Sequence, residues 1–129
     1  YLDLSSNSLT GTVPTQIGGF VNMSSYLDLK SNYLVGSLPS EMGLMTEFTQ
    51  QLDVQENDFT GSLPTQFGQM SLFNSYLDLH ANKLTGVAPT ELGNLVNLRE
   101  LYLLQNQLEG APEFFFVQTR PKTYTTEAN

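Results

Sequence analysis

Apolar residues return along this chain in a fixed order. Two leucines two residues apart, as at Leu27 and Leu29, are followed by apolar residues three apart, as at Met42, Met45 and Phe48. Alternation with period 2 predicts a short strand with one buried face. Spacing of three predicts a helical or 3₁₀ turn on the opposite side of each unit.

Polar and small residues mark the same units. An Asn follows each strand, at positions 25, 25, 25 and 24 residues apart: Asn7, Asn32, Asn57, Asn82 and Asn106. Its amide can satisfy backbone groups of its own and the adjacent unit, so these residues predict a structural ladder. Gly36 and Pro39, which recur with the same period, bracket a turn and a second extended piece. No unit can bury its apolar residues alone, so the units must stack into a solenoid.

The unit L-x-L-x-x-N-x-L-x-G-x-(apolar)-P resembles the plant-type leucine-rich repeat over about residues 1–112. The resemblance implies an α/β repeat solenoid, a right-handed superhelix with short parallel strands on its concave face and loops or 3₁₀ turns on its convex face. The units are 1–25, 26–50, 51–75, 76–99 and an incomplete 100–112. For the tail, 113–129, we predict a partial cap by Phe114–Phe116 and then disorder.

The chain begins inside a unit, so we expect an internal fragment of a longer repeat array. Its first coil should expose apolar residues such as Leu2, Leu4 and Leu9, and we predict marginal stability or self-association in isolation. Neighbouring repeats of the parent chain would then be partners.

Charge and composition narrow the partners. Five Lys+Arg against 13 Asp+Glu give a net charge of -8, which argues against nucleic acid and anionic lipid and is compatible with a basic partner. The chain has no Cys, hence neither a disulfide framework nor a thiolate metal site. No apolar run is long enough to predict membrane insertion of this segment.

Side chains that alternate with the strand leucines should point to the concave face in columns. One column holds tyrosines and the next holds Asp3, Asp28, Asp53 and Asp78, stacked at about 4.8 Å. This row predicts a site for a cation or for Lys and Arg of a partner, flanked by tyrosines that act as contact residues. A solvated acidic face, copied by duplication of the repeat, is the simpler and favoured interpretation of the aspartates. The candidate ligand-binding residues are Tyr26, Asp28, Lys30, Asp53, Gln55, Tyr76, Asp78, His80 and Tyr102.

Catalysis is not predicted. His80, the only histidine, lies two residues beyond Asp78, but no nucleophile accompanies it on an open face, and a solvated histidine is the favoured interpretation. A flat carboxylate row lacks the wrapped oxygen ligands that calcium prefers. We expect no catalytic residues, no metal and no cofactor.

Two features favour other functions or settings. Ranks of small hydroxyl residues, such as Thr10, Thr60 and Thr85, are similar to those of some ice-binding solenoids, although Ser and Thr also suit exposed extended segments. Asn22-Met23-Ser24 is a glycosylation sequon and favours the secretory route.

The sequence therefore predicts a non-catalytic module that presents its concave face to a protein or peptide. The resemblance implies a cell-surface receptor ectodomain or a secreted repeat protein, with an extracellular location. An ice-binding solenoid and an intracellular, cytoplasmic scaffold remain the alternatives.

Overall fold

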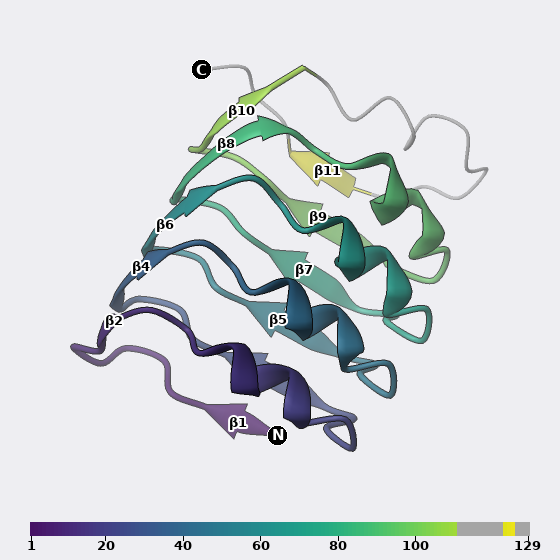
Figure 1. Ribbon diagram of the computed structural model, residues 1–129. Coiled ribbons are helices and arrows are strands. Elements are labelled where there is room, and N and C mark those ends of the chain that lie inside the picture. Colours follow the sequence, from purple (N-terminus) through teal and green to yellow (C-terminus); the bar gives the residue numbers. More distant parts are fainter. Residues whose placement is uncertain (111–122, 126–129) are drawn as a thin grey trace.

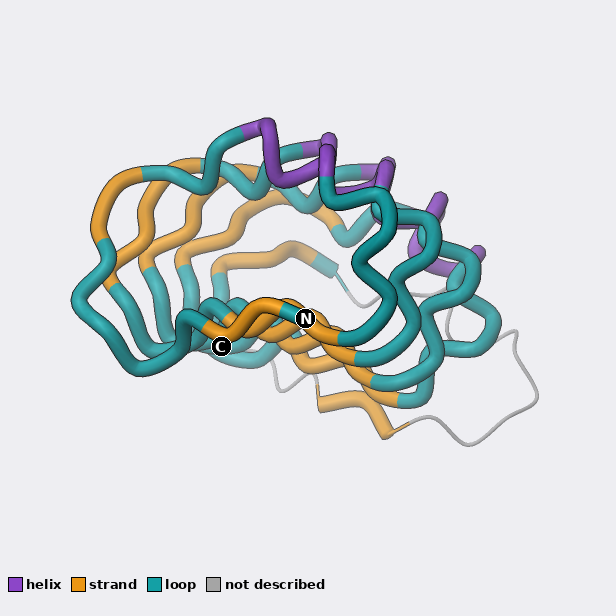
Figure 2. Tube along the Cα trace, turned by 90° about the horizontal axis from the view of Figure 1, so that it is seen from below, coloured by secondary structure: helices purple, strands orange, loops and turns teal. Residues whose placement is uncertain are grey.

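The computed structural model describes residues 1–110 and 123–125, and it is a stack of similar coils (Figures 1 and 2). Each coil passes through a strand of a six-stranded sheet, a strand of a five-stranded sheet and, in four coils, a 3₁₀ helix. Figure 2 looks into the stack and shows the 3₁₀ helices opposite the strands of the six-stranded sheet. These observations confirm the predicted leucine-rich-repeat solenoid, with parallel strands on one side and 3₁₀ turns on the other.

The six-stranded sheet, here called the large sheet, is parallel throughout. Its strands pair in the order β1 (Leu2–Asp3), β3 (Tyr26–Asp28), β5 (Gln51–Asp53), β7 (Tyr76–Asp78), β9 (Glu100–Tyr102) and β11 (Thr123–Thr125). In β3, β5, β7 and β9 the central leucine is buried, as alternation predicts. From β3 to β9, each central leucine pairs with the equivalent leucine of the next coil, for example Leu27 with Leu52. The repeat period and the sheet register therefore coincide, and equivalent positions form straight columns.

The five-stranded sheet, here called the lateral sheet, has a different register. It contains β2 (Thr10–Gly11), β4 (Tyr33–Gly36), β6 (Asp58–Gly61), β8 (Lys83–Val87) and β10 (Gln107–Glu109). Thr10 pairs with Tyr33, not with Val35, and Thr60 pairs with Lys83, not with Thr85. Equivalent residues are thus displaced by two positions along the strand, and they lie roughly 8 Å apart rather than about 4.8 Å.

The predicted asparagine ladder joins the coils between the two sheets. The Asn57 side-chain amide donates to the carbonyls of Leu29 in the previous coil and of Val54 and Gln55 in its own, at 3.0, 3.2 and 3.1 Å. Its Oδ1 accepts the Leu34 N–H at 3.0 Å. The set Asn32, Asn57, Asn82 and Asn106 is buried, whereas Asn7 in the first coil is exposed.

The sharp turn itself falls one residue before each Asn. Ser6, Ser31, Glu56, Ala81 and Gln105 all have φ between 52 and 54°, the left-handed region that costs most non-glycine residues about 1–2 kcal/mol. The ladder bonds that follow at once stabilise this conformation. A glycine at the end of the lateral strand, such as Gly61 with φ 76°, occupies the same region at no steric cost.

A second glycine, in the units that contain a 3₁₀ helix, lets neighbouring helices touch. The helices are η1 (Thr15–Gly19), η2 (Ser40–Leu44), η3 (Thr65–Gln69) and η4 (Thr90–Asn94). A Cβ atom on Gly43 would lie 2.3 Å from the carbonyl oxygen of Gln66 in the next coil, and one on Gly68 would lie 2.3 Å from that of Glu91. Only a residue without a side chain fits there.

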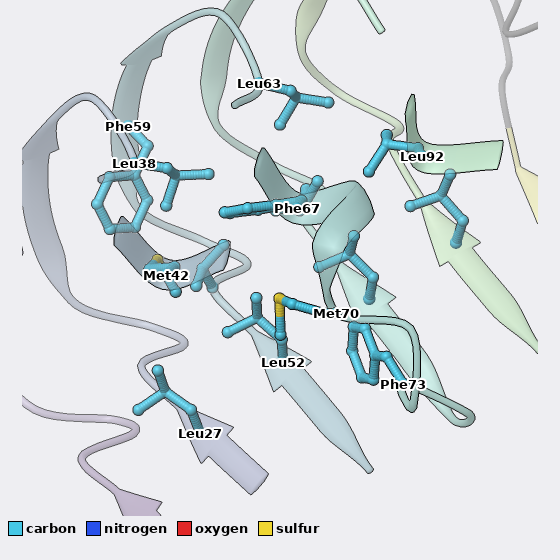
Figure 3. Packing of buried hydrophobic residues seen from close by; sticks show 14 of the residues in the cluster. Leu27, Leu38, Met42, Leu52, Phe59, Leu63, Phe67, Met70, Phe73 and Leu92 are labelled. Atoms are coloured by element: carbon cyan, nitrogen blue, oxygen red, sulfur yellow. The ribbon is translucent and has the colours of Figure 1, made fainter. Parts of the chain in front are cut away.

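The core runs through the middle of the stack, enclosed by both sheets and the helices. Figure 3 shows Leu52, Phe59, Phe67 and Met70, which come from different parts of the coil 51–75, in one cluster with Met42 and Leu92 of the adjacent coils. Phe48 and Phe73, at equivalent positions, meet edge to face with ring centroids 5.4 Å apart, a geometry that aromatic pairs favour. The apolar residues three apart in sequence therefore fill the space under the 3₁₀ helices.

The first coil agrees with its prediction more closely than the C-terminal tail does. Leu4 and Leu9 of the first coil are exposed, as predicted, and Leu2 is half-buried; self-association stays a prediction. The tail was predicted to become disordered after a cap, but Thr123–Thr125 form β11 and pair with β9. The cap residues Phe114–Phe116 lie outside the described residues. Within the described part of the chain, no helix is long and apolar enough to cross a membrane.

Candidate recognition surface

The outward side of the large sheet carries every predicted ligand-binding residue. Strand alternation places Tyr26, Asp28 and Lys30 on the side away from the buried Leu27 and Leu29. Because the sheet register matches the repeat, Asp28 pairs with Asp53 and Asp53 with Asp78. We call this side, with its tyrosine column, its carboxylate column and the column after it, the recognition face.

The carboxylates of this face are not the solvated residues that one interpretation of the sequence assumed. Asp28, Asp53 and Asp78 are only 5%, 1% and 7% exposed, while Asp3 in the first coil is exposed. The short Asp side chains lie between the longer side chains of the two neighbouring columns, and these longer side chains cover them. The prediction of an open acidic row is therefore wrong for the three central aspartates.

Each buried carboxylate is partly covered by the residue two positions later. Lys30 Nζ lies 3.5 Å from Asp28 Oδ2, Gln55 Nε2 donates to Asp53 Oδ2 at 3.2 Å, and His80 Nδ1 lies 2.8 Å from Asp78 Oδ1. The backbone N–H of each covering residue also donates to Oδ1 of the same aspartate. His80 is thus a paired, half-buried residue rather than the freely solvated one that the sequence favoured.

Asp53 is the electrostatic centre of the face. Burial raises the pKa of its carboxyl to about 6, the Gln55 backbone N–H opposes that rise, and the charges of Asp78 and Asp28 on either side add to it. The Asp28 charge in turn raises the pKa of the Lys30 ammonium. Negative charge is therefore concentrated just beneath the surface, where water screens it less than in bulk.

Tyrosines form the rim beside the carboxylates. Tyr1 and Tyr26 stack with ring centroids 4.9 Å apart, and Tyr76 meets Tyr102 edge to face at 6.5 Å. The Tyr102 hydroxyl donates to Glu100, which raises the pKa of that phenol. Burial raises the pKa of Tyr76 to about 12, and the aspartates of the face, Asp53 foremost, add to this effect. Neutral, amphipathic rings of this kind suit contact with a partner.

Two residues of the tyrosine column are not among the predicted ligand-binding residues. Gln51 and Glu100 occupy the tyrosine column, and Glu100 holds the Tyr102 hydroxyl. The period-25 alignment pointed to both positions, but their residue types did not resemble tyrosine. No group of three or more His, Asp or Glu side chains suited to a metal ion is found within residues 1–110 and 123–125.

The hydroxyl rank with Thr10, Thr60 and Thr85 lies on the lateral sheet, whose shifted register breaks it up, whereas the rank with Thr65 lies at the start of the 3₁₀ helices. Thr60 faces Lys83 across the sheet, and Val35 faces Asp58. Lys83 Nζ and Asp58 Oδ1 form an ion pair at 2.7 Å in the middle of that face. The threonines are exposed, as expected, but they are interleaved with charges.

The chain is similar to known proteins along most of its length. The leucine-rich-repeat family model matches residues 1–20, 49–70 and 75–95. No curated protein matches the chain.

Three solved structures illustrate the likeness. The ectodomain of the plant membrane receptor kinase GASSHO1/SCHENGEN3 from Arabidopsis thaliana, in complex with CASPARIAN STRIP INTEGRITY FACTOR 2, has 35% identity and a TM-score of 0.87 over 95% of this chain. The Arabidopsis receptor kinase HAESA, in complex with the peptide hormone IDA and the co-receptor SERK1, has 38% identity and a TM-score of 0.77 over 83%. A plant ice-binding protein has 31% identity and a TM-score of 0.80 over 88%.

Fold, repeat and comparisons agree on the class: the protein is a solenoid of stacked leucine-rich repeats. More narrowly, it belongs to the plant-type repeat class found in receptor kinase ectodomains. The chain spans 14% of the length of the GASSHO1/SCHENGEN3 ectodomain, 17% of that of HAESA and 37% of that of the ice-binding protein.

Proposed function

We propose that this chain is a non-catalytic module that binds a basic segment of a protein or peptide on its recognition face. The observation that carries the proposal is the straight column of buried carboxylates beneath a tyrosine rim. Two of the similar structures are plant receptor kinases bound to a peptide hormone or an integrity factor, which supports a peptide or protein as the partner class.

The geometry favours a cationic and partly apolar partner. Three carboxylates lie within two strand spacings, about 10 Å, and Lys30 forms its ion pair with Asp28, so the face keeps a negative potential. A partner's guanidinium could approach from above, compete with Gln55 or Lys30 for the carboxylates, and stack on the rings of Tyr26 or Tyr76. Charge would steer the encounter, and the tyrosines would supply the contact area.

The same comparisons support an extracellular role for the parent protein. We propose that the module works outside the cell, on a receptor or as part of a secreted protein, because the similar structures include the ectodomain of a plant membrane receptor kinase. An intracellular scaffold would need the same face but a reducing, cytoplasmic setting, which a chain without Cys also tolerates.

A random peptide display library tests the binding proposal. We expect peptides rich in Arg and Lys to be enriched, with affinities that weaken as salt rises. Combined Asp28→Asn, Asp53→Asn and Tyr76→Ala substitutions should abolish binding of the enriched peptides. The matched control is Glu47→Gln, which removes a charge from an exposed turn outside the large sheet. Enrichment without basic residues, or equal binding by the triple variant, would refute the proposal.

Ice binding is a second candidate, favoured by the similarity to a plant ice-binding protein. The interleaved ion pair of Asp58 and Lys83 weighs against it, because the threonines do not form an uninterrupted array. Thermal hysteresis that disappears when Thr60 and Thr65 are replaced by Tyr would establish this function. Its absence in the parent chain would exclude it.

A further inference from the structure

The turn between η1 and β3 carries a feature that the recognition face does not use. Asn22-Met23-Ser24 is the only N-x-S/T triplet in the sequence, and it lies in this turn. We propose that Asn22 is an N-glycosylation site and that the folded solenoid carries the glycan without rearrangement.

The local conformation presents the triplet in the way that a glycan requires. Asn22 and Ser24 are exposed, while Met23 between them is half-buried and packs against the core. The middle residue thus anchors the turn, and the two chemically required side chains point away from it. A bulky, hydrophilic sugar at Asn22 is accommodated only on such an outward position.

The backbone of the turn is also held in place. The Met23 N–H donates to the Phe20 carbonyl at 2.8 Å, and the Ser24 carbonyl accepts the Thr49 N–H of the next coil at 3.0 Å. The Thr49 hydroxyl donates to the same carbonyl. These bonds use main-chain atoms of the triplet and leave the Asn22 side chain outside the network that holds the turn.

The repeat offers an internal comparison. The positions equivalent to Asn22 in the next three coils are Glu47, Leu72 and Asn97, and all three are exposed; even Leu72 is 46% exposed. Exposure here is therefore a property of the repeat and not of one side chain. Asn97 is followed by Leu98-Arg99 and so lacks the hydroxyl that the acceptor triplet needs.

The experiment is to secrete the chain behind a cleavable leader from a eukaryotic host and to analyse cells and medium together. We expect one glycan, removed by peptide N-glycosidase with conversion of residue 22 to aspartate in tandem mass spectrometry. Asn22→Gln and Ser24→Ala should each abolish it. The melting temperature should be the same before and after enzymatic removal, because the turn is preorganised.

The substitution Glu47→Asn provides a matched control, because it places an acceptor triplet before Phe48-Thr49 at the equivalent position. We expect this variant to carry two glycans. An unmodified Asn22 in the parent chain would overturn the proposal, whether or not the new triplet is used. A glycan at Asn22 whose removal shifts the melting temperature would overturn the claim that the fold carries it without rearrangement.

Discussion

Replacing Asn57 by Leu removes one rung of the ladder in the middle of the stack while keeping the side-chain shape. The carbonyls of Leu29 and Val54 keep a second donor, from Asn32 and Asn82 respectively. The Leu34 N–H, by contrast, donates to Asn57 Oδ1, and it would become a buried, unsatisfied donor.

That orphaned N–H alone costs about 1–3 kcal/mol, and each weakened carbonyl adds a fraction of the roughly 0.5–1.5 kcal/mol of a typical hydrogen bond. We therefore expect the Asn57→Leu variant to lose about 2–4 kcal/mol of its free energy of unfolding. For a chain of this size, with an m-value of about 2 kcal/mol/M in urea, the midpoint should fall by roughly 1–2 M.

Urea unfolding followed by far-UV circular dichroism and tyrosine fluorescence measures this change, since the chain has six Tyr and no Trp. The matched control is Asn7→Leu. Asn7 is exposed, and its amide donates to Leu4 and Ser5 of its own turn, so we expect a loss below about 1 kcal/mol. Equal losses in the two variants, or an unchanged midpoint for Asn57→Leu, would refute the ladder argument.

Three further predictions follow from packing and charge. Gly43→Ala should lower stability by about 2–3 kcal/mol in urea unfolding, because the new methyl meets the Gln66 carbonyl at 2.3 Å; Gly19→Ala, which meets open space, should be neutral or slightly stabilising, and equal effects would contradict this contact. Because burial raises the pKa of Asp53 from 3.8 to about 6, the folded chain takes up this proton before the unfolded chain does. Stability should therefore rise between pH 7 and pH 4 by at most about 3 kcal/mol, and Asp53→Asn should flatten that part of the urea midpoint-versus-pH curve. Phe73→Ala should cost about 3–5 kcal/mol by calorimetry, since it empties the centre of the core next to Phe48; a loss below 1 kcal/mol would show that the core collapses around the gap.

Much of the fold could be predicted because the same pattern of apolar residues, asparagines and glycines recurs in five units. The strand leucines, the asparagines and the 3₁₀ segments follow from spacing alone, and the columns of the large sheet follow from a register equal to the period. The left-handed turn was not predictable from residue type, since Ser, Glu, Ala and Gln fill that position. The hydrogen bonds of the ladder, and not the type of side chain at the turn, hold the backbone in this left-handed conformation.

The sequence predicted which residues make up the candidate site but not how far their side chains are buried. Spacing identified Asp28, Asp53 and Asp78 as outward residues, yet it could not show that taller neighbours on both sides bury them. Burial of an outward position depends on the lengths of side chains in adjacent coils, which is a tertiary property. The two-residue shift in the register of the lateral sheet could not be predicted for a similar reason. The repeat fixes the period but not the tilt of each strand.

The two registers give the protein two different ways of varying its surface. On the large sheet, duplication of a unit extends an existing line of like residues, so a ligand that reads one column can be accommodated by adding or editing coils one at a time. On the lateral sheet, every row joins different positions of the unit, such as Val35 with Asp58 and Thr60 with Lys83. A single duplicated sequence therefore produces a mixed mosaic there without any divergence between copies. Selection for binding can therefore act along the columns of the large sheet. The lateral sheet stays chemically mixed and does not present stripes of identical residues through which two copies of the protein would associate.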